Sequence, residues 1–586
     1  MYRTVIGRIG FAAGLLFLFL SPVSTGEKTL IREIRFTGNH ALSEGQLLDV
    51  LTSKSSHGYV DSRLPLDRDN ILQRYRQEGY YFAVVPLPLL RFSDDSSEVT
   101  MTYSVQEGAQ AIIGEIAVQG NSLLPTREIL EQFETRVGSI LDSAILERDI
   151  HVLISRYEHH GYPFASVEVK DIDTIGGLQQ LRVLLSIDEG AKVTINEIRV
   201  QGNRETRQNV ILREARMPPS AVYDEESVSK IPQRLNRLNI FSSVHEPELY
   251  VNAHGGGLLI TVEEGNTNTF DGVIGYVPAA RDEEGGNVTG VVNVVMKNLF
   301  GTARKLNVHW QRDDRHSQEM SVQYVEPWIF DLPVNGSGSF FQRQQDTLYV
   351  RRVVGVKTDV LFSDIFSLGG FVNQENIIPA TTIATQAVSD SRTIAAGIEI
   401  HYDTRDDIMS PTSGVNYRTD YQIGKKRIFG TPVVGSNDQS TVQKVSMDAE
   451  GYVQTFERQV VALGLHGRQI TSENIELSDR FRFGGTGTLR GYRENQFLGS
   501  RIAWTNSEYR FLLARRSFFY GFFDTGYYFL PADDQRGIPS TQSFKYGYGV
   551  GIRVETSLGN IGVSIALGEG DSFSQAKLHV GLFNDF

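Results

Sequence analysis

Two groups of residues have types and spacings that could support enzyme or metal chemistry. Residues 485–487 read Gly-Thr-Gly, the start of a dinucleotide-binding loop, but Arg490 stands where that fingerprint requires a third glycine. His159 and His160 are adjacent, whereas a helical zinc pair is spaced four residues apart, so a solvated loop is the simpler interpretation. The sequence shows no zinc-protease motif, phosphate-binding Gly-Lys loop or calcium loop. We therefore expect a non-enzymatic protein without cofactor or metal.

The N-terminus predicts an export signal. Arg3 and Arg8 form a basic start, and an apolar run follows over residues 9–20. The small residues Ser24 and Gly26 come next. This order is typical of a secretory signal peptide at residues 1–26; an uncleaved membrane anchor is the alternative, which the shortness of the run disfavours. The chain has no Cys, so its stability must come from packed cores and sheets. A formal net charge of -13 without basic clusters argues against a nucleic-acid partner.

The residues that follow contain a threefold repeat. The copies read IREIRFTGN, IGEIAVQGN and INEIRVQGN at residues 31–39, 113–121 and 195–203. Their glycines, Gly38, Gly120 and Gly202, keep a constant step of 82 residues (120 − 38 and 202 − 120). Each copy also closes on Glu-Gly, at residues 107–108, 189–190 and 264–265. Ordered markers that recur in phase predict three tandem domains, at residues 27–108, 109–190 and 191–265.

Each repeat has the pattern of a small α+β domain. The opening strand alternates apolar and polar residues, and its Gly-Asn end tolerates the left-handed backbone of a turn. Two helical stretches follow, the second through Ile145, Leu153 and Tyr157 in the middle repeat. Two strands close that repeat, at residues 166–171 and 180–188. The order β-α-α-β-β predicts helices on one face of a sheet.

Residues 266–586 have a different pattern of apolar and polar residues. Helical periodicity disappears, and apolar residues alternate with polar ones, as in KLHVGL at residues 577–582. A period of two suits strands with one face to lipid and one to water, and in lipid such a sheet has to close. At roughly 20 residues per strand, this segment predicts a transmembrane antiparallel β-barrel of about 16 strands. A soluble β-sandwich or an adhesin array is the alternative, which the export signal disfavours.

One acidic cluster lies within this segment. Asp403, Asp406 and Asp407 suggest a calcium site at first sight. We favour a place on the wall of the barrel lumen or in a periplasmic turn.

The whole mature length resembles the BamA/TamA superfamily of outer-membrane assembly factors. The repeats are similar to its POTRA domains, and GGTGTLRGY at residues 484–492 is similar to its signature loop. Further segments resemble family motifs in family order: VEPW at 325–328, DTRD at 403–406, PTSG at 411–414, NSEY at 506–509 and FFDTG at 522–526. Three POTRA units resemble the TamA branch most, because BamA usually has five and two-partner secretion transporters usually have two.

The resemblance implies a lock for the signature loop, residues 484–500, inside the barrel. It places Arg490 against the carboxylates of Glu508 and Asp524 and the ring of Phe522. A guanidinium inside a barrel needs carboxylates within bidentate reach, and a glycine lets the loop backbone pass close to the wall. The complete set is Arg490, Gly491, Tyr492, Glu508, Phe522 and Asp524.

The resemblance also implies a lateral gate, where weak pairing of the first and last strands closes the barrel. The candidate strands are residues 268–276 and 576–586, in which glycines weaken packing. The gate residues are Gly272, Gly275, Val580, Gly581 and Phe586. The final Phe586 resembles the terminal signal of barrel proteins, although Asn584 departs from the apolar residue usual there.

The function implied is assembly or translocation at a bacterial outer membrane, with the POTRA domains in the periplasm. The clients would be autotransporters and related β-barrel proteins, and the partners a TamB-like inner-membrane-anchored protein and outer-membrane lipids. An open gate offers unpaired strand edges that template an incoming strand. A two-partner-type secretion pore for one exoprotein is the main alternative. A passive porin is disfavoured, because it would leave three POTRA units without a role.

Overall fold

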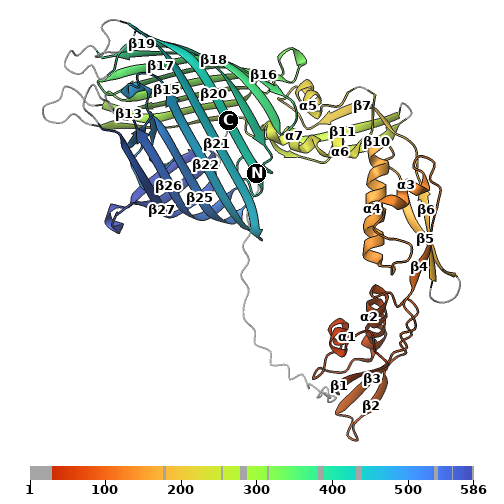
Figure 1. Cartoon of the computed structure of the whole chain (residues 1–586). Helices are drawn as coiled ribbons and strands as arrows, with labels where there is room; N and C mark the ends of the chain where they lie inside the picture. The colour runs from red at the N-terminus through yellow and green to blue at the C-terminus, as the bar shows by residue number, and fades with distance from the viewer. Residues whose placement is uncertain are drawn as a thin grey trace, which may run out of the picture. The chain divides into compact units, whose positions relative to one another are not determined.

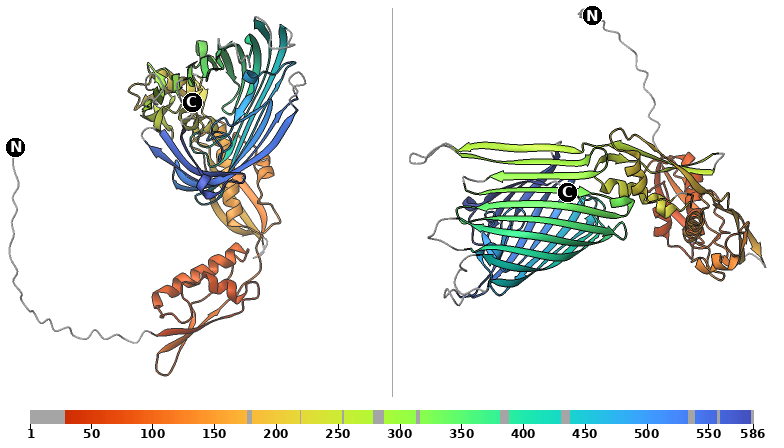
Figure 2. Two further views of the ribbon diagram at one scale, coloured as in Figure 1. Left: turned by 90° about the vertical axis from the view of Figure 1, so that its left-hand side faces the viewer. Right: turned by 90° about the horizontal axis from the view of Figure 1, so that it is seen from above.

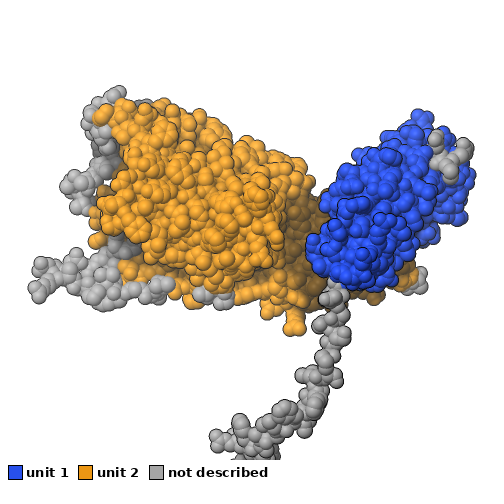
Figure 3. Space-filling model, turned by 90° about the horizontal axis from the view of Figure 1, so that it is seen from below, with its two compact units in different colours: residues 1–194, 222–225 blue, residues 195–221, 226–586 orange. Residues whose placement is uncertain are grey.

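The computed structural model (Figure 1) describes most of the chain, namely residues 29–175, 180–218, 220–252, 255–277, 287–312, 316–380, 388–429, 438–532, 539–556 and 559–583. The expected signal peptide and Phe586 lie outside the described residues. The chain divides into two compact units, coloured in Figure 3: residues 1–194 with 222–225, and residues 195–221 with 226–586. The first unit holds the first two repeats, and the second holds most of the third repeat and the large sheet.

In the first unit, each repeat forms a three-stranded sheet with two helices packed on it. The first repeat comprises β1 (Leu30–Thr37), α1 (Glu44–Val50), α2 (Leu64–Gln77), β2 (Leu89–Phe92) and β3 (Glu98–Ser104). The second comprises β4 (Ile112–Gln119), α3 (Thr126–Gln132), α4 (Ser143–His159), β5 (Ser166–Ile175) and β6 (Gln180–Asp188). The strand orders are β1-β3-β2 and β4-β6-β5, and the first strand of each repeat pairs in parallel with the last. The expected β-α-α-β-β order is confirmed.

The repeated glycine is required by a close backbone approach. Its φ is +81°, +87° and +91° at Gly38, Gly120 and Gly202. A Cβ built there would lie 2.2, 2.0 and 1.9 Å from the carbonyl oxygens of Val105, Ile187 and Val262. Left-handed backbone and this contact both exclude a side chain.

The closing glutamate of each repeat anchors the turn that follows the glycine. Glu107 accepts a hydrogen bond from the backbone N–H of Ala41 at 2.8 Å, and Glu189 accepts one from Ser122 at 2.6 Å. In the third repeat, Glu264 accepts from the backbone of Thr206 at 2.6 Å. The Glu-Gly marker therefore ties the end of each repeat to its own beginning.

The third repeat departs from the pattern. It comprises β7 (Thr194–Gln201), α5 (Gln208–Ala215), β8 (Ala221–Val222), α6 (Glu225–Ser229), α7 (Ile231–Arg237), β9 (Phe241–Val244), β10 (Glu248–Asn252) and β11 (Gly255–Glu264). Its second helical stretch is split, because Pro232 in the first turn of α7 removes a backbone donor and clashes with the preceding turn. Its sheet has the order β10-β11-β7-β8, and β9 pairs with β11.

The rest of the second unit is one antiparallel sheet of 16 strands, which the views of Figure 2 show curving on itself. Its first eight strands are β12 (Asn268–Val277), β13 (Asn287–Leu299), β14 (Arg304–Arg312), β15 (Gln318–Glu326), β16 (Val334–Gln345), β17 (Tyr349–Leu361), β18 (Phe366–Pro379) and β19 (Asp390–Asp403). Its last eight are β20 (Gly414–Phe429), β21 (Gln439–Phe456), β22 (Gln459–Thr471), β25 (Arg501–Ala514), β26 (Ser517–Leu530), β27 (Thr541–Thr556), β28 (Gly559–Gly568) and β29 (Lys577–Phe583).

Side chains alternate across this sheet as a membrane barrel requires. On β29, Leu578 and Val580 are 66% and 62% exposed, whereas His579 between them is 6% exposed. Polar groups pair on the inner face, where Lys357 on β17 bonds to Asp359 and to Glu399 at 2.9 Å. The expected antiparallel barrel of about 16 strands is confirmed. None of the helices within the described ranges has both the length and the apolar character needed to cross a membrane.

Candidate functional site

The signature loop folds back inside the sheet. It connects β22 to β25 and is closed by a short hairpin, in which β23 (Phe481–Phe483) pairs with β24 (Phe497–Gly499). A Cβ on Gly491 would lie 2.6 Å from the carbonyl oxygen of Leu567 on β28. A Cβ on Gly547 of β27 would lie 1.9 Å from the carbonyl oxygen of Arg490. Two glycines thus let the loop backbone touch the strand backbone.

Arg490 at the loop tip is fully engaged by the barrel wall. Its Nε and Nη2 donate to the two oxygens of Asp524 on β26 at 2.8 Å, and its Nη1 donates to Glu508 on β25 at 2.7 Å. The guanidinium lies 3.7 Å from the ring centroid of Phe522. Arg490 is 6% exposed and Asp524 is 0% exposed. A buried bidentate ion pair of this kind is strongly damaged by removal of either partner.

Tyr492 fixes the far side of the tip. Its hydroxyl donates to the carbonyl of Tyr546 at 2.9 Å and accepts from the backbone N–H of Glu569 at 3.0 Å. Its ring lies edge-on to Phe497, with 5.0 Å between centroids, and Phe497 stacks on Tyr528. The loop therefore contributes its own apolar core to the lumen.

His579 joins the loop to the last strand, a contact that the sequence analysis did not predict. Its Nε2 accepts a hydrogen bond from the backbone N–H of Gly491 at 3.0 Å, so this nitrogen carries no proton. Its Nδ1 then donates to the hydroxyl of Thr486 at 3.2 Å. The alternation in residues 577–582 was the one sequence signal for this contact, since it places His579 on the inner face.

Upstream of the hairpin, a second ionic contact fixes the connection from β22 to strand β20. Lys426 on β20 is 2% exposed, and its Nζ donates to Glu476 at 2.9 Å and to Asp479 at 2.7 Å. The connection between β22 and β25 is therefore held at two places on the inner wall.

A cavity lies beside the loop tip. It has a volume of about 260 Å³ and is lined by Thr486, Arg490, Glu508, Arg510, Arg553 and His579, among others. Its lining is mostly polar, and it is large enough to hold several water molecules.

The third repeat is fixed to turns of the large sheet, within the same unit. Trp328 Nε1 donates to Glu214 at 2.6 Å, and Arg216 and Arg234 both pair with Asp364, at 2.9 and 2.8 Å. Burial raises the pKa of Glu214 above its usual value, although the Trp328 hydrogen bond and nearby arginines act in the opposite direction. This repeat and the sheet are packed as one body.

Comparison with known families matches both parts of the chain. The Omp85 superfamily domain matches residues 298–583, and the POTRA model, described as a surface antigen variable number repeat, matches residues 29–108, 111–190 and 193–265. The chain belongs to the Omp85 superfamily. The resemblance found in the sequence is thereby confirmed at the level of the BamA/Omp85 superfamily, whose members are assembly or transport factors.

Several known proteins are similar to this Omp85 chain. The outer membrane protein assembly factor BamA of Nitratidesulfovibrio vulgaris is 24% identical over 86% of the chain. The chain spans 66% of the length of that relative, and less of several others. Among solved structures, BamA from Haemophilus ducreyi lacking POTRA domains 1–3 covers 80% of this chain and 98% of its own, with 14% identity and a TM-score of 0.49. CdiB from Escherichia coli covers 88% and 98%, with 13% identity and a TM-score of 0.48.

Superfamily membership and the 16-stranded sheet also give the location. The chain is an outer-membrane β-barrel protein with periplasmic POTRA domains. Strand β12 therefore begins on the periplasmic side, and the signature loop arises on the outer side.

The expected gate strands are the two ends of the sheet. Gly272 lies opposite Val292 of β13, and Val580 lies opposite Val563 of β28. Within the residues that the structure describes, β12 pairs only with β13 and β29 only with β28. Gly275 and Gly581 lie in these same two strands, opposite Thr289 and Gly562. The structure does not bring Gly272 and Val580 into register with each other.

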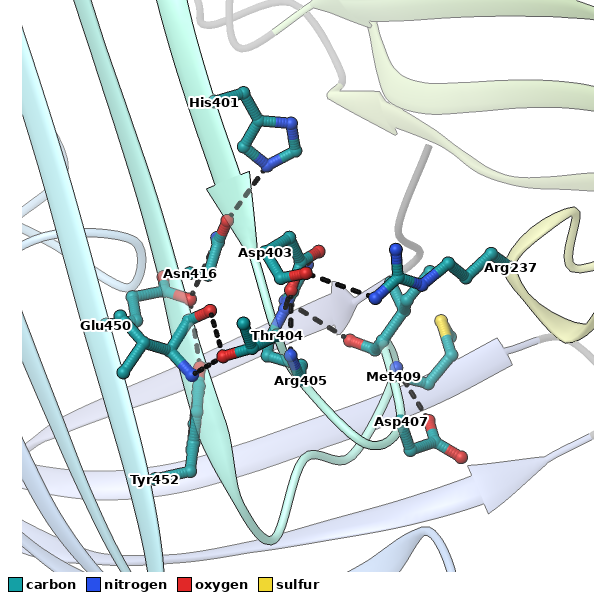
Figure 4. Close-up of polar contacts among 12 residues, drawn as sticks. Arg237, His401, Asp403, Thr404, Arg405, Asp407, Met409, Asn416, Glu450 and Tyr452 are labelled. Atoms are coloured by element: carbon teal, nitrogen blue, oxygen red, sulfur yellow. Dashed lines mark hydrogen bonds and ion pairs between the residues drawn. The ribbon is translucent and has the colours of Figure 1, made fainter. Parts of the chain in front are cut away.

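The acidic cluster lies at the turn between β19 and β20, shown in Figure 4. Asp403 pairs with Arg405 at 2.9 Å, and its carbonyl accepts a hydrogen bond from Arg237 of the third POTRA domain at 3.1 Å. Asp406 accepts from the backbone of Thr412, and Asp407 from that of Met409. The three carboxylates thus organise the turn, and no cluster suited to a metal ion occurs among the described residues.

The two adjacent histidines lie at the end of α4. His159 Nδ1 lies 2.8 Å from an oxygen of Asp224, and His160 Nδ1 lies 2.7 Å from the carbonyl of Arg156. Each ring is engaged by a different neighbour.

Proposed function

We propose that this Omp85 protein is an outer-membrane assembly factor that inserts β-barrel clients, autotransporters among them, through a lateral gate between β12 and β29. The observation that carries the proposal is that these two strands are the ends of the described sheet. Each has a single hydrogen-bonded neighbour in the described part of the sheet. An unpaired strand edge presents a row of N–H and C=O groups that an incoming strand can extend.

The position of the signature loop supports a lateral route over passage through the barrel. The loop folds back inside the sheet, and its tip is held there by Arg490 and Tyr492. We call the line along which β12 and β29 face each other the seam. A client strand that enters there can pair directly with the backbone groups at the edges of these strands. The driving force is then burial of the apolar face of the client in lipid together with backbone pairing, without nucleotide hydrolysis.

A reducible crosslink across the seam tests the gate. The chain has no Cys, so Gly272→Cys combined with Val580→Cys introduces the only pair of thiols. A flexible bifunctional maleimide with a cleavable disulfide spacer joins them, because the two positions are not in register and a direct disulfide would be too short. The matched control is Gly272→Cys with Val292→Cys, because these two positions face each other in the β12–β13 register. Each protein is reconstituted in lipid vesicles with an unfolded barrel client, and client insertion is followed by protease resistance.

The seam crosslink should abolish client insertion, and reduction of its spacer should restore insertion, whereas the same crosslink in the control pair should leave insertion intact. Barrel folding is checked by heat-modifiable migration on gels. Full insertion by completely crosslinked seam protein would exclude the lateral gate. A client that reaches the vesicle interior without becoming membrane-inserted would favour the dedicated secretion pore instead.

A TamB-like periplasmic partner is the second element of the proposal. In the first POTRA domain, β2 is at the edge of the sheet order β1-β3-β2, and Leu89 on it is 69% exposed. An edge of this kind accepts a further strand from a partner. A photo-crosslinking residue at position 89 in the full-length protein should capture an inner-membrane-anchored protein in envelopes. The same residue at position 66, on the exposed face of α2, is the control, and equal capture at both positions would contradict edge pairing.

A further inference from the structure

The turns on the periplasmic rim of the barrel fall into two chemical classes. The chain enters β12 from the third POTRA domain, so every second connection lies on the periplasmic side. Six of these connections are described: residues 300–303, 327–333, 362–365, 404–413, 457–458 and 515–516. The first three join strands between β13 and β18, and the other three join strands between β19 and β26.

The first three turns each present an exposed phenylalanine. Phe300, Phe330 and Phe362 are 76%, 91% and 63% exposed. Leu332 beside Phe330 is 56% exposed. Exposed apolar groups gathered in one region mark a surface that meets a partner.

The other three turns are charged. One is Glu457-Arg458, another is Arg515-Arg516, and the third contains Arg405 and the acidic cluster described above. Arg458 is exposed, and the side chain of Arg515 is 73% exposed. The first three turns therefore present exposed phenylalanines, with the exposed Asp331 beside one of them. The other three present charged groups, with Phe456 at the end of β21 67% exposed beside Glu457.

Two of the phenylalanines lie on strained backbone. Phe300 and Phe330 have φ values of +56° and +54°, and Trp328 close to Phe330 also has +54°. Bulky residues rarely adopt this left-handed backbone, because it brings Cβ too close to the neighbouring carbonyl. In the chain by itself, neither ring gains burial in return.

Polar groups of the same three turns bind the third POTRA domain. The carbonyl of Gly301 accepts a hydrogen bond from the backbone N–H of Arg207 at 2.8 Å. Trp328 bonds to Glu214, and Asp364 pairs with Arg216 and Arg234, as described above. All these partners belong to the third POTRA domain. Its contacts take the polar groups of each turn and leave the phenylalanine exposed.

The ring of Phe362 continues the lipid-facing wall of the barrel. The ring of Phe362 lies 5.9 Å from that of Phe366 at the start of β18. Val360 and Leu368, which are paired across β17 and β18, are each 38% exposed on the outer face. Aromatic side chains are favoured where a barrel wall meets the polar edge of a bilayer.

We propose that the three aromatic turns between β13 and β18 are immersed in the membrane leaflet on the periplasmic side, so that lipid covers Phe300, Phe330 and Phe362. The charged turns between β19 and β26 remain in water. The third POTRA domain, bonded to the immersed turns, is thereby held at the membrane surface below the first strands of the barrel. Lipid contact of this rim does not depend on client assembly.

Site-specific fluorescence tests this proposal on the full-length protein in phosphatidylcholine vesicles. Phe330→Cys is labelled with an NBD fluorophore, and Arg458→Cys, in one of the charged turns, is the matched control. Quenching is compared between nitroxide groups on lipid acyl chains and iodide in the aqueous phase. Gel mobility establishes that each barrel is folded, and Phe362→Cys serves as a second site should the first variant misfold.

The label at position 330 should show blue-shifted emission, strong acyl-chain quenching and weak iodide quenching, and the label at position 458 should show the reverse. Equal iodide quenching at both positions would overturn the proposal. Protection of position 330 from both quenchers would also overturn it, because a protein surface rather than lipid would then cover the turn.

Discussion

Replacement of Arg490 by alanine should release the signature loop. The substitution removes three charged hydrogen bonds to Asp524 and Glu508. Glu508 keeps Arg510, whose Nε donates to it at 2.8 Å, whereas the carboxylate of Asp524, which is 0% exposed, loses its charged partner and keeps the backbone N–H of residue 490 at 3.1 Å. Breaking a buried ion pair from one side costs about 3–5 kcal/mol. We expect a loss of this size for Arg490→Ala, and a smaller loss for the double variant Arg490→Ala, Asp524→Asn.

Two measurements separate loop release from barrel unfolding. Protease cleavage between residues 484 and 500 in intact vesicles reports the released loop, and the denaturant midpoint of the heat-modifiable form reports the barrel. Arg493→Ala is the control, because Arg493 belongs to the same loop and is exposed. Arg490→Lys keeps the charge but loses the planar fork, so it should lie between wild type and Arg490→Ala.

Either of two results would refute this account of the loop. One is an Arg490→Ala protein whose loop is as resistant to protease as that of Arg493→Ala. The other is a double variant no more stable than Arg490→Ala, which would mean that loss of the charged partner of Asp524 is not the source of the destabilisation.

Two further predictions concern His579 and Glu214. His579→Ala leaves the buried N–H of Gly491 without its acceptor and should cost about 1–3 kcal/mol of stability, measured as faster protease cleavage of the loop. His579→Gln, whose amide oxygen is also an acceptor, should cost less. Unchanged cleavage in the alanine variant would show that this contact does not hold the loop. Glu214 has a pKa raised from 4.5 by burial, so its contribution to stability is full below that value and falls as the pH rises through the folded-state pKa. Glu214→Gln, which still accepts a hydrogen bond from Trp328, should flatten the fall in thermal stability as the pH rises above 4.5, and a profile parallel to wild type would refute this.

The repeats were predictable because their markers serve local backbone needs. A glycine that touches a carbonyl and a glutamate that caps its own repeat leave the same letters in each copy. One marker was missed, although it keeps the same step: Asp67 and Asp149 are 82 residues apart (149 − 67) and buried. Asp67 accepts from the backbone N–H of Thr52 at 2.6 Å, and Asp149 from that of Glu134 at 2.8 Å. A carboxylate on an otherwise apolar helix face is easily interpreted as a solvated charge until the turn above it is known.

The barrel was predictable in kind and in strand number, because a period of two sustained over so many residues is typical of a large sheet with one face in lipid. Its inner contacts were not. Lys426 meets Glu476 and Asp479 only because of the path that the connection from β22 takes across the lumen, and nothing in the spacing of these residues encodes that path. The same holds for the turn of Trp328, which the sequence marked as a family motif without revealing that it bonds to a POTRA helix.

The loop contacts were anticipated from the family resemblance rather than from residue spacing. The structure brings Arg490, Glu508, Phe522 and Asp524 together, although residues 490 and 524 are separated by two strands' length of chain. Alternation along the last strand gave the face on which His579 lies but not its neighbour. Which residues of β12 and β29 would face each other depends on strand register, which alternation alone does not define.

Because each POTRA domain caps its own entry turn with its own glutamate, a module carries within itself the contacts that define its ends. Loss or duplication of one whole POTRA domain at the N-terminal end of the array would break none of these glutamate hydrogen bonds in the other domains. The third domain differs, since its helices are bonded to the barrel rim. POTRA domains can therefore be added or removed at the N-terminal end of the array without breaking a contact of this kind, whereas removal of the third domain would also break its hydrogen bonds and ion pairs to the barrel.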